Sequence, residues 1–214
     1  MTEPAPLDVG PEGMLLTDRV AVVTGAAQGI GEAVAVALAR FGADVAICDR
    51  DEAGLADTVD EVEHAGRGAL AGVLDVRDHE AVTRWLEEVD DRHGRVDILV
   101  NNAGGGFHSP FLDVSPKGQT ALVDENFTSV THFVRGCVPL MGERGGSIVN
   151  ITSIEAHRAG PGFAVYSAMK AAVENLSRSL AVELAERRIR VNCISPDMIP
   201  TPGDDGLSLE AAAD

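Results

Sequence analysis

The stretch TGAAQGIG, residues 24–31, joins an apolar run to a run with helical character, and this junction decides the fold. The apolar run RVAVVT, 19–24, is typical of a buried strand. The run GEAVAVALARFG, 31–42, is rich in alanine, which favours a helix. The glycines of the junction therefore predict a tight turn that leads from a strand into a helix.

The same glycines suit a phosphate group. Gly25 allows the tight turn, whereas Gly29 and Gly31 let backbone approach a pyrophosphate and let the helix pack on the strand. The beginning of the helix would offer free N–H groups to the phosphates. The spacing G-x-x-x-G-x-G departs from the general dinucleotide fingerprint, so an ordinary packing site is the alternative. Asp49 ends the next strand at about the position of a ribose-binding carboxylate, and the two features together favour dinucleotide binding.

Strands and helices alternate along the rest of the chain. The strands are continuous hydrophobic runs, which indicates a parallel sheet covered by helices on both faces. Right-handed crossovers then predict a doubly wound, Rossmann-like α/β fold in a single domain, with strand order 3-2-1-4-5-6. The expected strands are 19–24, 43–49, 68–76, 96–102, 146–152 and 189–195. The expected helices are 31–42, 51–65, 79–93, 118–142 and 163–187.

Composition limits the partners and the location of the protein. The formal net charge is −17 and Lys and Arg form no cluster, so no nucleic-acid partner is expected. No apolar run approaches a membrane span, and the acidic, proline-rich start lacks a signal-peptide pattern, so we expect a cytoplasmic protein without membrane contact. We expect a disordered arm at 1–16, the domain at 17–201 and a shortened tail at 202–214.

Five motifs follow one another in the order and spacing of a known family. They are TGAAQGIG, NNAG at 101–104, Asn126, Ser153 and YSAMK at 166–170, with thirteen positions from Ser153 to Tyr166. Over 17–201 the chain resembles the short-chain dehydrogenase/reductase family. The resemblance implies an enzyme that transfers a hydride between NAD or NADP and a small-molecule secondary alcohol or ketone.

Tyr166 is the only tyrosine, and it shares a helical face with Lys170 because the two are four residues apart. A nearby ammonium favours the phenolate, so we expect the lysine to lower the pKa of the tyrosine. By resemblance, Tyr166 is the general acid/base and Lys170 also binds the nicotinamide ribose. By the same resemblance, Ser153 holds the substrate oxygen, and Asn126 marks a helix kink that holds a water in the proton relay.

The resemblance also implies a set of cofactor contacts. Asp75 and Val76 would read the adenine, and Asn102, Ala103 and Gly104 would line the adenosine side. The segment after the sixth strand would hold the nicotinamide carboxamide. The expected cofactor-binding residues are Gly25, Gln28, Gly29, Ile30, Gly31, Asp49, Arg50, Asp75, Val76, Asn102, Ala103, Gly104, Tyr166, Lys170, Pro196, Ile199 and Thr201.

Among nicotinamide cofactors we expect NAD to be preferred. Asp49 would accept hydrogen bonds from the ribose 2′-OH and repel a 2′-phosphate. Gln28 is neutral where phosphate-preferring relatives often carry arginine. Arg50 could turn toward a phosphate, so NADP remains possible.

Two departures from the family pattern leave an alternative open. Asp197 follows Pro196 where the family usually has glycine, and Asp lacks glycine's freedom at positive φ. After Thr201 only PGDDGLSLEAAAD follows, so we expect the family's substrate lid, last helix and seventh strand to be missing. The alternative is a non-catalytic dinucleotide-binding scaffold or a truncated, inactive homologue. A hydrolase is not favoured, because Ser153 lacks the G-x-S-x-G elbow, and no metal site is expected, because the histidines lack ligand spacing.

Substrate contacts are weakly specified by the sequence. Gly106, Phe107 and His108 follow the fourth expected strand, and Glu155 and His157 follow Ser153. Carboxyl ends of strands border the crevice in this fold, so these residues are candidates, with plain loop histidines as the alternative.

The resemblance implies a homo-oligomer, with a dimer favoured and a tetramer possible. The helices expected at 118–142 and 163–187 would pair with their twofold mates. The second helix carries small residues suited to close approach, and symmetric pairing of such a face is the usual route to a homodimer. They are Ala164, Ala168, Ala171, Ala172 and, beside them, Leu176.

Overall fold

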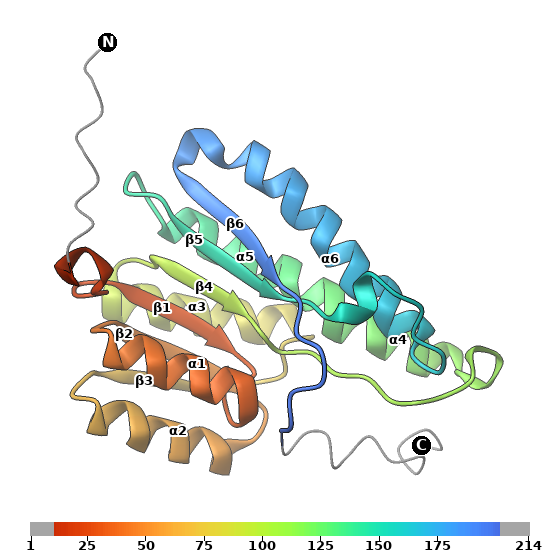
Figure 1. Ribbon diagram of the computed structural model, residues 1–214. Helices are drawn as coiled ribbons and strands as arrows, with labels where there is room; N and C mark the ends of the chain where they lie inside the picture. Colours follow the sequence, from red (N-terminus) through yellow and green to blue (C-terminus); the bar gives the residue numbers. More distant parts are fainter. Residues whose placement is uncertain (1–10, 202–214) are drawn as a thin grey trace.

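One parallel sheet forms the centre of the molecule. The computed structural model describes residues 11–201, in which six strands lie in the order β3-β2-β1-β4-β5-β6 (Figure 1), and this confirms the expected order. All neighbouring strands pair in parallel, so their carboxyl ends meet at one edge of the sheet. The strands are β1 (Val20–Thr24), β2 (Asp44–Asp49), β3 (Ala69–Val73), β4 (Ile98–Asn101), β5 (Gly146–Ile151) and β6 (Ile189–Ile194).

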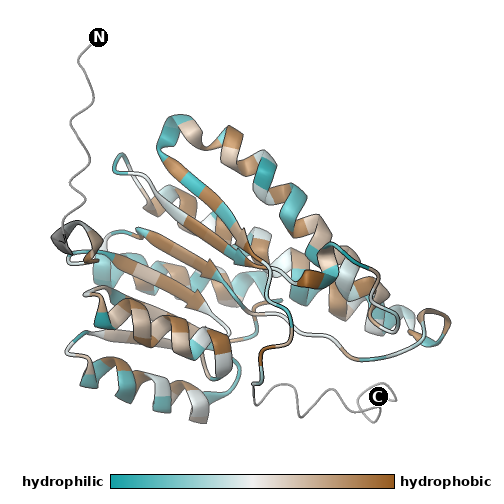
Figure 2. Ribbon diagram, in the orientation of Figure 1, coloured by the Kyte–Doolittle hydropathy of each residue, from teal (hydrophilic) through white to brown (hydrophobic). Residues whose placement is uncertain are grey.

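Helices cover both faces of this sheet, which confirms the doubly wound arrangement. Val23 of β1 packs in a core with α1 and α2, whereas its neighbour Val22 packs in a second core with α3, α5 and α6. The inner strands β1 and β4 are therefore hydrophobic along most of their length, whereas the edge strand β6 and the helices are mixed (Figure 2). The helices are α1 (Gly29–Arg40), α2 (Glu52–His64), α3 (His79–His93), α4 (Pro116–Val123), α5 (Ser129–Leu140) and α6 (Ala164–Glu183).

Three elements differ from their expected form. The third strand was expected at 68–76 but ends at Val73, because its partner β2 ends at the paired residue Asp49. The helix expected at 118–142 is interrupted by a π-helical turn, Asp124–Thr128, between α4 and α5. The helix expected at 163–187 ends at Glu183 and continues as a 3₁₀ turn, Ala185–Arg187.

The described chain begins near the amino end of β1 and ends beyond the carboxyl ends of the strands (Figure 1). Residues 1–10 of the expected arm and the expected tail, 202–214, lie outside the described residues. Within 11–16, a 3₁₀ helix covers Pro11–Met14, and the N–H of Leu16 donates to the carbonyl of Phe41 at 2.7 Å. No helix between residues 11 and 201 is long and apolar enough to cross a membrane.

Candidate active site

The glycine loop after β1 has the backbone that only glycine accepts easily. Gly25 and Gly29 both have positive φ, 65° and 63°. A Cβ on Gly25 would lie 2.8 Å from the Cα of Ala103, and a Cβ on Gly31 would overlap the carbonyl oxygen of Gly25. The residue before α1, Gln28, makes no side-chain hydrogen bond to the first turn. The first N–H groups of α1 thus lack a side-chain cap beside the cleft.

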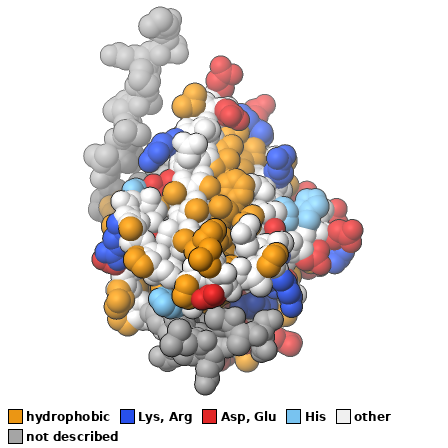
Figure 3. Space-filling view, turned by 90° about the vertical axis from the view of Figure 1, so that its right-hand side faces the viewer, with side chains coloured by type: hydrophobic (Ala, Val, Ile, Leu, Met, Phe, Trp, Pro, Cys, Tyr) orange, Lys and Arg blue, Asp and Glu red, His pale blue; other side chains and the backbone are white. Residues whose placement is uncertain are grey.

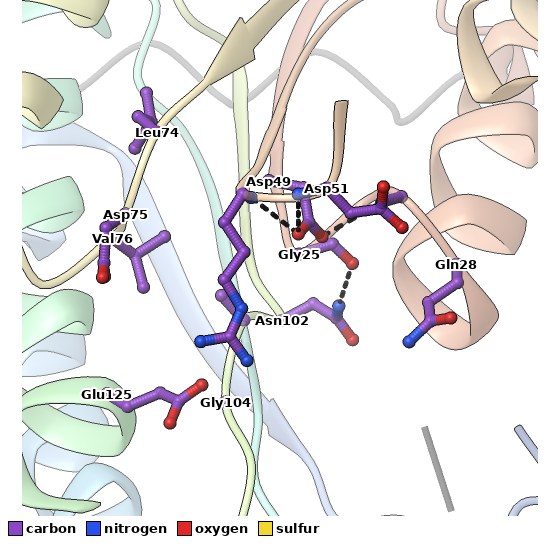
Figure 4. Close-up of a pocket in the computed structure, with 13 residues that line it drawn as sticks. Gly25, Gln28, Asp49, Asp51, Leu74, Asp75, Val76, Asn102, Gly104 and Glu125 are labelled. Carbon is purple, nitrogen blue, oxygen red and sulfur yellow. Dashed lines mark hydrogen bonds between the residues drawn. The ribbon is translucent and has the colours of Figure 1, made fainter. Parts of the chain in front are cut away.

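Asp49, the last residue of β2, is held beside the glycine loop. Its Oδ2 accepts from the N–H of Ala27 at 3.1 Å, and its Oδ1 accepts from the N–H groups of Arg50 at 2.7 Å and Asp51 at 3.1 Å (Figure 4). These three bonds orient the carboxylate without neutralising its charge. A hydroxyl donor in the cleft would find an acceptor there, whereas an anion would be repelled.

The opposite wall of this cleft comes from β4 and the segment after β3. Thr24 Oγ1 accepts from the N–H groups of Asn102 and Ala103, each at 3.0 Å, and the side-chain amide of Asn102 donates to the carbonyl of Gly25 at 2.9 Å. The carboxylate of Asp75 accepts from Arg77, and this contact lowers the pKa of Asp75 below its ordinary value. The cleft measures about 360 Å³.

A second cleft of about 440 Å³ continues from the first, because Gln28, Asn102 and Gly104 line both. Residues from the ends of β5 and β6 and from α6 complete it. Those predicted from the sequence are Gly29, Ile30, Ser153, Tyr166, Lys170, Pro196, Ile199 and Thr201.

Ser153, Tyr166 and Lys170 meet on one wall of the second cleft. Ser153 follows β5 and caps the 3₁₀ helix Ile154–Ala156, where its Oγ accepts from the N–H of Glu155 at 3.2 Å. The Ser153 hydroxyl lies close enough to the Tyr166 hydroxyl to act on its pKa. Lys170 Nζ lies 5.5 Å from the centroid of the Tyr166 ring and donates to the carbonyl of Ile151 at 3.0 Å.

Asn126 lies behind this wall, in the π-helical turn. Its Nδ2 donates to the carbonyls of Gly105 at 2.8 Å and Leu122 at 3.0 Å, and its Oδ1 accepts from the N–H of Gly105 at 3.2 Å. A Cβ on Gly104 would lie 2.9 Å from that Oδ1 and 3.0 Å from Lys170 Nζ. The glycine therefore lets Asn126 and Lys170 approach the same stretch of backbone.

The model of the short chain dehydrogenase family matches residues 19–211, almost the whole chain. This chain belongs to the short-chain dehydrogenase family. It is accordingly an oxidoreductase.

Three relatives of this short-chain dehydrogenase show the extent of the likeness. The 3-oxoacyl-[acyl-carrier-protein] reductase FabG of Thermotoga maritima is 35% identical, over 92% of this chain and 81% of its own. The carveol dehydrogenase of Mycobacterium avium, solved with NAD, is 35% identical with a TM-score of 0.82, over 85% of this chain and 71% of its own. A short chain dehydrogenase of Mycobacterium paratuberculosis, bound to NAD, is 35% identical with a TM-score of 0.86, over 92% and 78%.

Burial dominates the electrostatics of this dehydrogenase site. It lowers the pKa of Lys170 to about 8, although the charge of Glu125 acts in the opposite direction. Burial also raises the pKa of Tyr166, against the effect of the Ser153 hydrogen bond, and Glu155 raises it further. The expectation that the pKa of Tyr166 would be lowered is therefore wrong for this structure. With a pKa of about 8, the Lys170 ammonium is still mostly protonated at neutral pH.

Not all of the residues predicted from the sequence line one of the two clefts. Gly31 and Asn126 line neither cleft and act from behind, through packing and hydrogen bonds. Among the candidate substrate contacts, Gly106 and Glu155 line the second cleft, whereas Phe107, His108 and His157 do not. His108 packs edge-on against Phe163, with ring centroids 5.4 Å apart.

Several residues of this short-chain dehydrogenase were missed by the sequence analysis. Thr24 was read as a strand end, yet its hydroxyl holds two backbone N–H groups of the NNAG segment. Its place directly before the glycine loop was the available signal. The other missed lining residues include Ala27, Asp51, Leu74, Glu125, Arg158, Phe163 and Met198. Most of them lie on loops and Glu125 lies in the π-helical turn, so their approach to the cleft depends on tertiary structure.

Proposed function

We propose that this oxidoreductase transfers a hydride between a nicotinamide cofactor, NAD in preference to NADP, and a secondary alcohol or ketone. One observation carries the proposal. The wall formed by Ser153, Tyr166 and Lys170 faces a cleft that continues past the glycine loop to the carboxylate of Asp49. A reacting group and an adenosine could therefore lie at the two ends of one extended site.

The residues present fit a nicotinamide dinucleotide. The glycine loop leaves no room for side chains and sets the uncapped N–H groups of α1 beside the cleft, where a pyrophosphate would be held. Asp49 would hold the adenosine ribose, and the segment that carries Ile199 and Thr201 would hold the nicotinamide end. When bound, the nicotinamide supplies the carbon that accepts or gives the hydride.

Tyr166 would handle the proton of the reaction. In the oxidative direction, its oxygen takes the proton of the alcohol, and in the reductive direction its hydroxyl gives a proton to the carbonyl oxygen. Ser153 would donate a hydrogen bond to the same substrate oxygen and stabilise the charge that develops there. Lys170 would bind the ribose and supply positive charge, and Asn126 would support the backbone beside it.

The names of relatives support the substrate class. FabG of Thermotoga maritima is named as a reductase of a 3-oxoacyl group, and the Mycobacterium avium protein as a dehydrogenase of carveol. A carbonyl group and an alcohol at the reacting carbon are the two sides of one hydride transfer. Glu155, Phe163 and Met198 line the cleft where the rest of the substrate would lie.

A panel of secondary alcohols with NAD, and of ketones with NADH, tests the proposal on the whole chain. The expected result is formation or consumption of reduced nicotinamide with at least one pair of substrates. Tight binding of NAD without turnover of any substrate would instead favour a dinucleotide-binding scaffold. Lack of both binding and turnover would contradict both functions.

Cytoplasmic location and self-association belong to the same proposal. The small residues of α6 motivate a homodimer, and the cytoplasmic location stays a prediction. The division into an arm, a domain and a tail likewise stays a prediction.

A further inference from the structure

A buried carboxylate lies one helical turn after Lys170. Glu174 of α6 is only 7% exposed. Its Oε1 accepts from Ser195 Oγ at 3.0 Å and from Thr152 Oγ1 at 3.3 Å, and it lies 2.8 Å from Nε2 of His157. Three side chains from two segments, the loop after β5 and the segment after β6, thus converge on one oxygen atom. Such a buried acceptor is costly to leave unpaired, so the four side chains hold one another in place.

The three partners all stand at segments that border the second cleft. Thr152 immediately precedes Ser153 at the end of β5, and Ser195 immediately follows β6. His157 follows the 3₁₀ helix that Ser153 caps. The residue whose hydroxyl would contact the substrate is therefore flanked on both sides by residues that contact Glu174.

Backbone hydrogen bonds connect the loop after β5 with the segment after β6, but not with α6. The N–H of Thr152 donates to the carbonyl of Ile194, and the N–H of Ile154 donates to the carbonyl of Pro196, both at 2.8 Å. These bonds fix the loop after β5 against the segment after β6. They do not fix it against α6, the helix that carries Tyr166 and Lys170. The Lys170 ammonium of α6 donates to the carbonyl of Ile151, which precedes the loop on the side of β5.

We propose that Glu174 is a positioning residue for the reaction. Through Thr152 and His157 it holds the loop of Ser153 against α6, and so sets the distance between the Ser153 and Tyr166 hydroxyls. The inference rests on the proposed function of those two hydroxyls. Misplacement of a reacting group by about 1 Å can cost on the order of a hundredfold in rate, so a distant carboxylate can have a large effect.

A second contact between the loop after β5 and the segment after β6 is more exposed than the contacts of Glu174. Arg158 contacts Glu155 at 3.0 Å and Asp197 at 2.9 Å, but the side chains of Arg158 and Asp197 are 52% and 64% exposed. Ion pairs between exposed side chains contribute little to stability, because solvent screens them. Glu174 is thus the contact that holds the loop, and the bridge through Asp197 is a weaker addition.

The test uses the whole chain with Glu174→Ala and Glu174→Gln, and with Glu183→Gln as a matched control at the exposed end of α6. Turnover, NAD affinity, thermal stability and hydrogen exchange of the peptide 152–158 are measured for each. We expect Glu174→Ala to lower kcat by roughly 10–100-fold while the Kd for NAD changes by less than about threefold. Glu174→Gln retains an acceptor for Ser195 and Thr152, so it should recover most of kcat. Glu183→Gln should match the wild type.

The decisive comparison places Glu174→Ala on a Ser153→Ala background. If Glu174 acts through Ser153, the second substitution should lower kcat by less than about threefold, because coupled residues are non-additive. A full multiplicative loss would overturn the proposal, since it would show a general structural role. Should the wild type transfer no hydride, the proposed function fails, and hydrogen exchange decides the inference alone. Faster exchange at 152–158 in Glu174→Ala supports the positioning role, and unchanged exchange overturns it.

Discussion

Lys170 shows at the scale of one residue how tertiary burial sets the chemistry of the site. The residue is 5% exposed, and burial lowers the pKa of its ammonium to about 8. In the unfolded chain the pKa of lysine is about 10.4. Between those values the unfolded state binds the proton and the folded state does not, so this group makes the free energy of unfolding rise with pH. Below about pH 8 both states are protonated and the effect is constant.

The variant Lys170→Met tests whether the Lys170 ammonium is buried in the folded protein. The free energy of unfolding of the wild type minus that of the variant should increase from about pH 8 to about pH 10, by at most roughly 3 kcal/mol. Denaturant titrations of both proteins at several pH values measure the difference, in which the other titrating groups cancel. A difference that stays flat or falls over this interval would show that the ammonium is solvated in the folded protein.

Asp49 carries the expected choice between the two cofactors. Three backbone N–H groups hold its carboxylate in place, so its charge would face a 2′-phosphate directly. We expect the wild type to bind NAD more tightly than NADP. Asp49→Ala should weaken NAD binding. It should also reduce the difference in binding free energy between NAD and NADP by roughly 1–3 kcal/mol. Calorimetric titration with both cofactors measures it, and an equal or tighter affinity of the wild type for NADP would contradict the assignment.

Pairing of Tyr166 with Lys170 could be predicted from their spacing, but the direction of the pKa shift could not. Four residues on a helix suffice to place two side chains on one face. Burial depends instead on what packs over that face, and here Gly106 lies against the ring, with a Cβ position 3.2 Å from Tyr166 Cδ2. That packing joins segments sixty residues apart, which no local pattern reports.

At the scale of elements, the π-helical turn joins α4 and α5 to the segment after β4. Asn126 makes this connection with three hydrogen bonds, and the residue is 1% exposed. Asn126→Ala would leave the N–H and carbonyl of Gly105 without their partner. We expect the free energy of unfolding to fall by about 1–3 kcal/mol and turnover to fall with it.

Thr120→Ala on α4 is the matched control for Asn126→Ala. Thr120 Oγ1 donates to the carbonyl of Pro116 at 3.0 Å on an exposed part of the helix, so its loss should be nearly neutral. Chemical denaturation and steady-state kinetics of the two variants give the comparison. An Asn126→Ala variant as stable and active as the control would show that the Asn126 hydrogen bonds matter neither for stability nor for turnover.

Most elements could be predicted from the sequence, and the exceptions have one cause. The helix expected at 79–93 matches α3, His79–His93, because Asp78 caps its start and Gly94 ends it with a left-handed backbone. Both signals are local. The break at 124–128 depends on the Asn126 side chain reaching Gly105, and the early end of β3 depends on where β2 ends. Each requires a contact between segments distant in sequence.

For the whole molecule, the expected assembly concerns the face formed by α4, α5 and α6. Figure 3 views the molecule from the side on which α4 and α6 lie in Figure 1, and a band of hydrophobic side chains runs down its centre. On α6, Ala164 and Ala168 are exposed and Ala171 and Ala172 half-buried, whereas Leu176 packs against the core. All five residues predicted for the interface are thus at least partly accessible.

Light scattering at micromolar concentration measures the assembly directly. We expect a dimer, because small side chains allow two copies of α6 to approach closely about a twofold axis. Ala168→Arg should convert it to a monomer, whereas Glu183→Gln, farther along α6, should not. A clean monomer of the wild type would contradict the helical interface, and a stable tetramer would show a second interface.

The central claim is that Tyr166 exchanges the proton while NAD exchanges the hydride. The most direct measurement is the turnover of wild type and Tyr166→Phe with NAD and the best alcohol of the panel, beside the NAD affinity of each. Phenylalanine keeps the ring and its packing and removes only the exchangeable proton. Tyr166→Phe should therefore lower turnover by roughly 10²–10⁴-fold and leave NAD affinity nearly intact. A variant that retained more than about a tenth of the wild-type rate would contradict it.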